Sequence, residues 1–236
     1  MMKRFWKQTS VKESKDNYSI LLDQRQLKTP AGSVITIPKN NKLLAVLVAA
    51  EWESQQDVLK NYSLPLTSIM TRAVDSFEDQ NTRQNAINTL LNYVHSDSIC
   101  FHQDYPESFV KLQEEYWLPI LDWVSSTYGV TVKTTDGICG IKQPDELINK
   151  LRKTLESYDN IKLAAFEKAV LRAKSFMIGL ALIERRISVE YASMAARLEV
   201  QQQINRWGEV EDAHDIDRDD LKRQLGSAIA TTLKDN

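Results

Sequence analysis

The spacing of hydrophobic residues changes once along this chain, and that change constrains the fold more than any other feature. Residues 5–11 and 18–22 are short segments rich in aromatic and β-branched residues, which is typical of β-strands. A third such segment, residues 33–38, follows the turn-forming Pro30 and Gly32. Beyond this opening region the apolar residues recur every three or four positions nearly to the end, as they do in amphipathic helices.

The pattern predicts an α+β fold, with a small N-terminal antiparallel β-rich domain followed by a larger all-helical C-terminal domain. We place the boundary so that the domains are 1–62 and 63–236. The first domain is expected to include one helix, from residue 40 onward, which has Asn at its cap and packs on the strands. In the second domain, further helices are expected at about 145–156, 161–185, 188–206 and 217–233.

Composition excludes several classes of function. A hydrophobic fraction of 42% in 236 residues supports a real core, and 30 basic against 32 acidic residues leave no overall positive field for nucleic acid. The longest apolar runs, residues 43–50 and 176–183, are too short to cross a membrane. Cys100 and Cys139 are too few for a disulfide framework or a four-cysteine zinc site. We therefore expect neither nucleic-acid binding nor membrane insertion.

Two charged residues stand at positions where the helical pattern expects apolar or small ones. Lys174 shares a face with Val170 and Met177, and Glu199 lies beside alanines on the next expected helix. If the connection 185–188 folds these helices antiparallel, the two charges lie equally far from its midpoint. A buried charge is tolerable only with a partner, so we predict a structural ion pair between Lys174 and Glu199.

A Trp-Gly pair near the end of the chain is followed by a dense run of acidic residues. The run admits three interpretations: a metal site, a carboxylate active site, or an acidic surface for another protein. The residues concerned are Trp207, Gly208, Glu209, Glu211, Asp212, His214, Asp215, Asp217, Asp219 and Asp220.

The known signatures of chemistry are missing from this sequence. Its three histidines lack the spacing of a helical zinc site, and the acidic run lacks the glycine and the terminal glutamate of a calcium-binding loop. Neither a glycine-rich phosphate loop nor a Gly-x-Ser-x-Gly nucleophile motif occurs. We expect no metal, no cofactor and no enzymatic step. The alternative is a helical-domain hydrolase that uses His214 and the adjacent carboxylates, in an apolar pocket.

Trp207 differs from the other four tryptophans, most of which we expect to pack in the core or between elements. It precedes Gly208, which is expected to end its helix, so its ring either anchors the bend or faces a partner as a hot-spot residue.

Several phrases together, in their order and spacing, resemble one family, the assembly chaperones of the mitochondrial ATP synthase catalytic sector that receive the alpha subunit. The resemblance spans nearly the whole chain, and one departure is Gln24, where the family commonly has Gly. The phrases are "RFWK" (4–7), "LLDQRQLKTPAG" (21–32), "LAVLVAAEWESQ" (44–55), "LPLTSIMTRAVD" (64–75), "YVHSDSICF" (93–101), "KSFMIGLAL" (174–182) and "RLEVQQQINRWGEVEDAHD" (197–215).

The resemblance implies a chaperone without catalysis, whose partner is the unassembled alpha subunit of the proton-transporting ATP synthase. It would cover the apolar surface of that subunit until beta subunits replace it. It implies a mitochondrial matrix protein, with a presequence removed, that works as a monomer. Glu199 is expected to shape the helical hairpin, whereas Trp207, Glu209 and Glu211 face the client. The positions that match the functional ones of the family are Glu199, Gln202, Trp207, Gly208, Glu209, Glu211 and His214.

Overall fold

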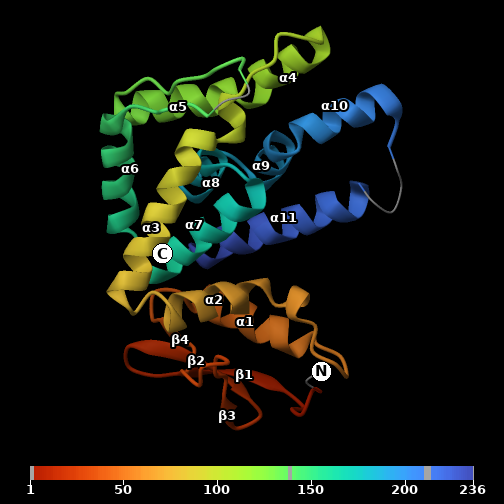
Figure 1. Cartoon of the computed structure of the whole chain (residues 1–236). Helices are drawn as coiled ribbons and strands as arrows, with labels where there is room; N and C mark the ends of the chain where they lie inside the picture. Colours follow the sequence, from red (N-terminus) through yellow and green to blue (C-terminus); the bar gives the residue numbers. More distant parts are fainter. Residues whose placement is uncertain (1–2, 138–139, 210–213, 236) are drawn as a thin grey trace. The chain divides into compact units, whose positions relative to one another are not determined.

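The computed structural model describes residues 3–137, 140–209 and 214–235, and it confirms an α+β fold. An antiparallel sheet comes first in the chain, and helices follow it (Figure 1). None of the helices in these described ranges is long and apolar enough to span a membrane. The strands and first helices are β1 (Thr9–Glu13), β2 (Asn17–Leu22), β3 (Arg25–Gln26), β4 (Thr36–Pro38), α1 (Lys42–Glu53), η1 (Asn61–Ser63) and α2 (Pro65–Asp75).

Contacts between residues divide the chain into two compact units. The first unit contains residues 1–83, 160–165 and 227–236, and the second contains residues 84–159 and 166–226. These units are defined by contacts, whereas the boundary expected between residues 62 and 63 is a change of periodicity. That boundary remains a prediction.

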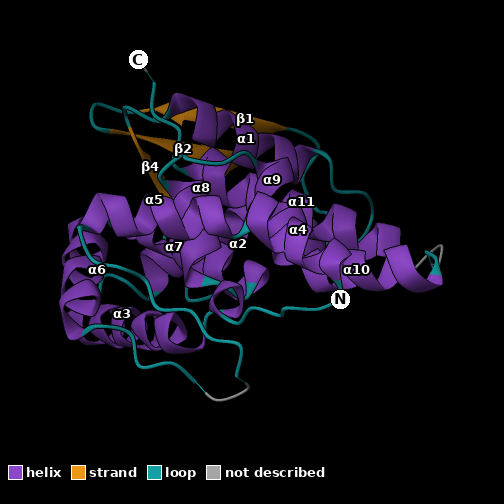
Figure 2. Cartoon of the chain, turned by 90° about the horizontal axis from the view of Figure 1, so that it is seen from above, coloured by secondary structure: helices purple, strands orange, loops and turns teal. Residues whose placement is uncertain are grey.

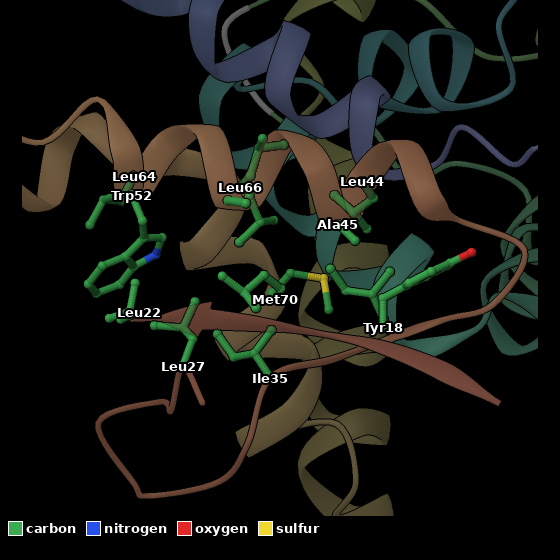
Figure 3. Packing of buried hydrophobic residues seen from close by; sticks show 14 of the residues in the cluster. Tyr18, Leu22, Leu27, Ile35, Leu44, Ala45, Trp52, Leu64, Leu66 and Met70 are labelled. Atoms are coloured by element: carbon green, nitrogen blue, oxygen red, sulfur yellow. The ribbon is translucent and has the colours of Figure 1, made fainter. Parts of the chain in front are cut away.

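The sheet of the first unit is built around β2, the strand with the most buried side chains. β1 and β2 form an antiparallel hairpin in which Val11 lies opposite Ile20, and both β3 and β4 pair with β2. Tyr18 and Ile20 point toward α1, because alternate residues of a strand face the same side. Figure 3 shows the resulting core, where strand residues meet residues of α1 and α2. Its labelled members are Tyr18, Leu22, Leu27, Ile35, Leu44, Ala45, Trp52, Leu64, Leu66 and Met70.

The turn between β2 and β3 explains how the chain tolerates Gln24 in place of the family's glycine. Asp23, and not Gln24, takes the left-handed conformation, with a φ of 54°. The carboxylate of Asp23 accepts hydrogen bonds from the backbone N–H groups of Lys7 (3.0 Å) and Gln8 (3.1 Å). These bonds stabilise the left-handed backbone conformation of Asp23, which aspartate adopts more readily than most residues do.

The helices of the second unit are shorter than the sequence pattern predicted. Residues 161–185 do not form one helix, because Lys174 is left-handed (φ 54°) and the hydroxyl of Ser175 accepts a hydrogen bond from Ile178 N–H, which starts a new helix. The later helices are α3 (Gln80–Tyr93), α4 (Glu107–Tyr116), α5 (Leu118–Tyr128), α6 (Asp145–Ser157), α7 (Asn160–Ala173), α8 (Phe176–Ile183), α9 (Val189–Ala196), α10 (Leu198–Trp207) and α11 (His214–Thr231). The short 3-10 turns η2 (Val94–Ser96) and η3 (Ser98–Cys100) lie between α3 and α4.

Two other expected helices also differ from the structure. The segment 188–206 is divided at Arg197 into α9 and α10, and the last helix begins at His214 instead of residue 217. α8 forms the buried centre of the second unit, because all eight of its side chains are buried. The expected helix 145–156 is present as α6, whose leucines form one buried stripe.

Candidate functional site

The structure overturns the predicted ion pair between Lys174 and Glu199. Both side chains are exposed, and the described residues include no ion pair between them. Lys174 lies in the turn that separates α7 from α8, and Glu199 lies in the first turn of α10, so neither charge is inside a helical hairpin. The prediction failed because it assumed two unbroken helices, whereas both segments contain a break. Glu199 therefore does not form the structural ion pair that we predicted.

The sequence-predicted surface residues lie on α10 and at the start of α11. Trp207, the last residue of α10, is 71% exposed, whereas Trp6, Trp52 and Trp117 are buried in the core. The guanidinium group of Arg206 lies 5.0 Å from the centre of the Trp207 ring, in a cation–π contact. Gly208, with a φ of 90°, then turns the chain away from the helix. The indole is therefore presented to solvent at the end of α10.

α10 is an amphipathic helix whose apolar stripe is only partly covered. Leu198 is its single buried residue. Val200, Ile204 and Trp207 recur at intervals of four and three positions, which places them on one face, directed away from Leu198. Val200 and Ile204 are half-buried, and Ile216, in the first turn of α11, is 63% exposed. This region thus leaves large apolar side chains accessible to a partner.

Arg197 fixes the beginning of α11 to the beginning of α10. Its Nε atom donates to Asp217 Oδ2 at 3.1 Å, and its Nη2 atom donates to the backbone oxygen of His214 at 2.9 Å. The side chain of Arg197 is only 11% exposed, so these bonds are sheltered from water on its side. The backbone of His214 is thereby held in place, and its imidazole is half-buried.

The acidic residues of the site have different surroundings. Glu209 is exposed and lies 3.7 Å from Arg218 of α11, a distance typical of a weak surface ion pair. Asp220 faces Arg172 and Arg223, and its pKa is lowered by hydrogen bonds from Arg223 and Gln224 and by the two arginine charges, which outweigh desolvation. Glu211, which the sequence also singled out, lies outside the described residues.

Gln202 connects α10 to α4, and the two helices lie side by side (Figure 2). Its Nε2 atom donates to Ser108 Oγ at 3.1 Å, and Ser108 Oγ is 3.3 Å from its Oε1 atom. This contact pairs the first turn of α4 with the middle of α10. Tyr105, just before α4, is 77% exposed. Gln202 therefore positions α10 and is less available to a partner than we expected from the sequence.

Sequence reasoning missed Arg197, Tyr105 and Ile216. None of the three carried a usable signal. The pattern predicted one unbroken helix over 188–206, so the break at Arg197 is visible only in the structure. An exposed aromatic or aliphatic residue likewise has the same local pattern as a buried one.

The groups with strongly shifted pKa values lie away from α10. Burial raises the pKa of Asp97 to about 6, against the opposing effect of hydrogen bonds from Ser175, Met177 and Ile99. Burial, and secondarily the charge of Asp97, also raise the pKa of the Cys100 thiol. No group of three His, Cys, Asp or Glu side chains within the described ranges is placed to hold a metal ion. Both shifts therefore arise mainly from burial in the core.

Comparisons with known proteins identify relatives over the whole length. A model of the ATP12 chaperone protein family matches residues 3–125. "Protein atp12, mitochondrial" of Schizosaccharomyces pombe is 35% identical over 234 residues, which cover 96% of this chain and 80% of that protein. "Protein ATP12, mitochondrial" of Saccharomyces cerevisiae is 30% identical, covering 98% and 84%. The crystal structure of Atp12 from Paracoccus denitrificans is similar with a TM-score of 0.80 and 27% identity, covering 98% and 95%.

Proposed function

The chain belongs to the ATP12 family of ATP synthase assembly chaperones, and on that premise we propose that it binds the unassembled alpha subunit of the enzyme. The bound chaperone prevents aggregation of the alpha subunit until beta subunits take its place. It acts without a cofactor and without an enzymatic step. Its relatives in two yeasts are named as mitochondrial proteins, and we place this one, as a monomer, in the mitochondrial matrix.

The observation that carries the proposal is the exposure of Trp207. A tryptophan that is 71% exposed leaves most of its large ring in water, which is unfavourable unless a partner covers it. Val200 and Ile204 extend the same face of α10, so a client segment can bury a continuous stripe. Orphan subunits expose apolar surface that is later buried in the assembled enzyme, and such surface matches this stripe.

The charges around Trp207 support a transient contact. Glu209 and Asp219 share Arg218 as a partner at 3.7 and 3.4 Å, so each is only weakly neutralised, and Asp215 adds a further carboxylate. A client with basic residues beside its apolar segment is attracted to this rim. Charges at a solvated rim speed association more than they slow dissociation, which suits a chaperone that must release its client.

The test measures suppression of aggregation. Denatured alpha subunit is diluted into buffer with the full-length chaperone, and light scattering is followed. We expect Trp207→Ala to weaken binding about tenfold, the effect of losing a moderate hot-spot residue. Tyr62→Ala is the matched control, since Tyr62 is a 64% exposed aromatic residue of the first unit. Adding beta subunit should then release the wild-type chaperone from the alpha subunit.

Each result bears on a separate part of the proposal. Equal suppression by the wild type and Trp207→Ala would show that the α10 surface does not bind the client, but it would not contradict the chaperone function. Failure of the wild type to suppress aggregation would remove the function itself. Equal binding to free and assembled alpha subunit would indicate a general scaffold protein instead of an assembly chaperone.

A further inference from the structure

A second potential interaction site lies on the outer edge of the sheet, in the first unit. Among the strands that the structure describes, β1 is terminal and pairs with β2 alone. Two backbone hydrogen bonds show which residues of this strand direct their N–H and C=O groups toward β2. They run from Asp23 N–H to Gln8 O and from Ser14 N–H to Asn17 O, both at 2.9 Å. In an antiparallel pair, residues whose backbone groups bond to the partner strand alternate with residues whose backbone groups point away from it. Val11 and Glu13 therefore direct their backbone N–H and C=O groups away from the sheet.

At one end of the outer edge the backbone groups of β1 are hydrogen-bonded to α1, and further along the described strand they are not. Glu53 of α1 accepts a hydrogen bond from Thr9 N–H at 2.7 Å, and Thr9 Oγ1 donates to Ala49 O at 3.1 Å. For Val11 and Glu13 there is no such partner within the ranges that the structure describes. These two residues offer two donors and two acceptors at strand spacing. An additional extended segment can pair with them, as in peptide recognition by strand addition.

The segment that carries this edge is positively charged, although charges nearly cancel over the whole chain and Glu53 pairs with Arg4 at the end bonded to α1 (3.3 Å). Residues 3–15 contain five basic side chains and one acidic side chain. The acidic one, Glu13, is held in an ion pair by Lys39 of the neighbouring loop, and Lys39 also donates to Ser14 O at 3.1 Å. Lys12 and Lys15 are exposed. A partner at the open edge therefore meets unneutralised lysines.

These observations select the chemistry of the occupant. Lysines on an edge strand normally discourage pairing with other strands, because the incoming strand must accept nearby cations. A second copy of this chain would bring the same cations to β1 and would be repelled. An acidic extended segment gains from both the open backbone groups and the lysines. We propose that β1 binds an acidic, extended segment of a partner protein, which adds to the sheet as a further strand beside Val11 and Glu13.

This site is independent of the α10 surface, so it goes beyond the proposed function. It gives the chaperone a second point of attachment, on residues that play no part in the presentation of Trp207. Two attachment points within one chain raise the effective concentration of the second contact once the first has formed.

The test uses a labelled octapeptide of alternating glutamate and valine, added to the full-length protein and followed by fluorescence anisotropy. Val11→Pro removes the outward N–H of Val11 but no bond to β2, and proline is tolerated on edge strands. We expect it to weaken binding at least tenfold, whereas Val11→Ala, which loses packing but keeps the N–H, should bind as the wild type does. Circular dichroism confirms that both variants are folded.

A second pair of measurements separates strand addition from simple electrostatic attraction. Lys12→Glu should weaken binding severalfold, and an octapeptide of alternating lysine and valine should not bind. In the wild type, the peptide should slow hydrogen exchange at the amides of Val11 and Glu13. The proposal is overturned if Val11→Pro binds as tightly as Val11→Ala, if these two amides are not protected, or if the wild type shows no saturable binding of the acidic peptide.

Discussion

The carboxylate of Asp235 accepts a hydrogen bond from the backbone N–H of Lys42 at 2.6 Å, across 193 positions of sequence. Its second oxygen lies 3.4 Å from Leu43 N, and its own N–H donates to Asn40 O at 2.9 Å. The end of the chain thus caps the first helix of the first unit. Asn41 is the N-cap residue of α1, but its side chain makes no capping bond and instead donates its N–H to Thr231 O at 3.3 Å.

Removing this distant cap should destabilise the first unit. Asp235→Ala leaves the first N–H groups of α1 without an acceptor, and we expect a loss of about 1 kcal/mol in the free energy of unfolding. Asp235→Asn keeps an acceptor oxygen and should lose less. Urea unfolding of the full-length variants measures both values. An unchanged midpoint for Asp235→Ala would show that water satisfies these groups equally well.

Gly179 lets α8 approach α7 closely. A Cβ atom at this position would lie 2.8 Å from Val170 Cγ2 and 3.1 Å from Val170 N. Gly179→Ala should therefore cost about 1 to 3 kcal/mol, because the core must shift to relieve the overlap. Adding Val170→Ala removes only the side-chain part of the clash, so the double variant should not recover fully. Thermal unfolding is the measurement.

Gly226 is the matched control for Gly179. It also lies within a helix, α11, but apart from its own helix backbone and chain neighbours no described atom lies within 4 Å of the position that its Cβ would take. Gly226→Ala should leave stability unchanged or raise it by up to about 1 kcal/mol, because alanine restricts the unfolded chain and favours a helix. Similar losses for both alanine variants would mean that helix packing is not the reason for Gly179.

The buried carboxyl group of Asp97 should make stability depend on pH. Burial raises its folded-state pKa to about 6 from 3.8, so the folded protein binds a proton more tightly than the unfolded chain. The stabilisation of the folded state by this tighter proton binding is complete below pH 3.8 and is lost as the pH rises through about 6. Two pKa units correspond to about 3 kcal/mol. Urea unfolding at several pH values measures the change.

Asp97→Asn isolates this effect, because other carboxylates titrate in the same range. The difference in unfolding free energy between the wild type and this variant should change in favour of the variant between pH 4 and 7. The amide oxygen can still accept from Met177 N–H, which Asp97 accepts at 2.8 Å. A difference that stays constant over this range would show that Asp97 titrates at its ordinary pKa.

Arg197 should hold the start of α11 in place. Arg197→Ala removes the bonds to Asp217 Oδ2 and to His214 O, together with the packing of a mostly buried side chain. We expect faster hydrogen exchange in the first turn of α11 and a loss of about 1 to 2 kcal/mol in stability. Arg197→Lys keeps the charge but cannot make both bonds, so it should be intermediate. Unchanged exchange in both variants would contradict the assignment.

The sequence by itself determined the fold class and the helix end that presents Trp207. Strand-like segments before residue 40 and helical periodicity after it predicted an α+β fold, because the period of burial follows directly from backbone geometry. The Trp-Gly pair predicted the end of α10, and only glycine adopts a φ of 90° at Gly208 without strain. The family resemblance came from the same residues and is confirmed by the comparisons.

Tertiary structure decided which partners the charged residues have. The sequence suggested Lys174 for Glu199, but a left-handed turn at Lys174 and a helix break at Arg197 leave both residues in solvent. It gave no sign that Asp235 would cap Lys42 or that Gln202 would bind Ser108. Local propensities determine where elements form, whereas ion pairs and caps between distant residues depend on how the elements pack, which no local pattern encodes.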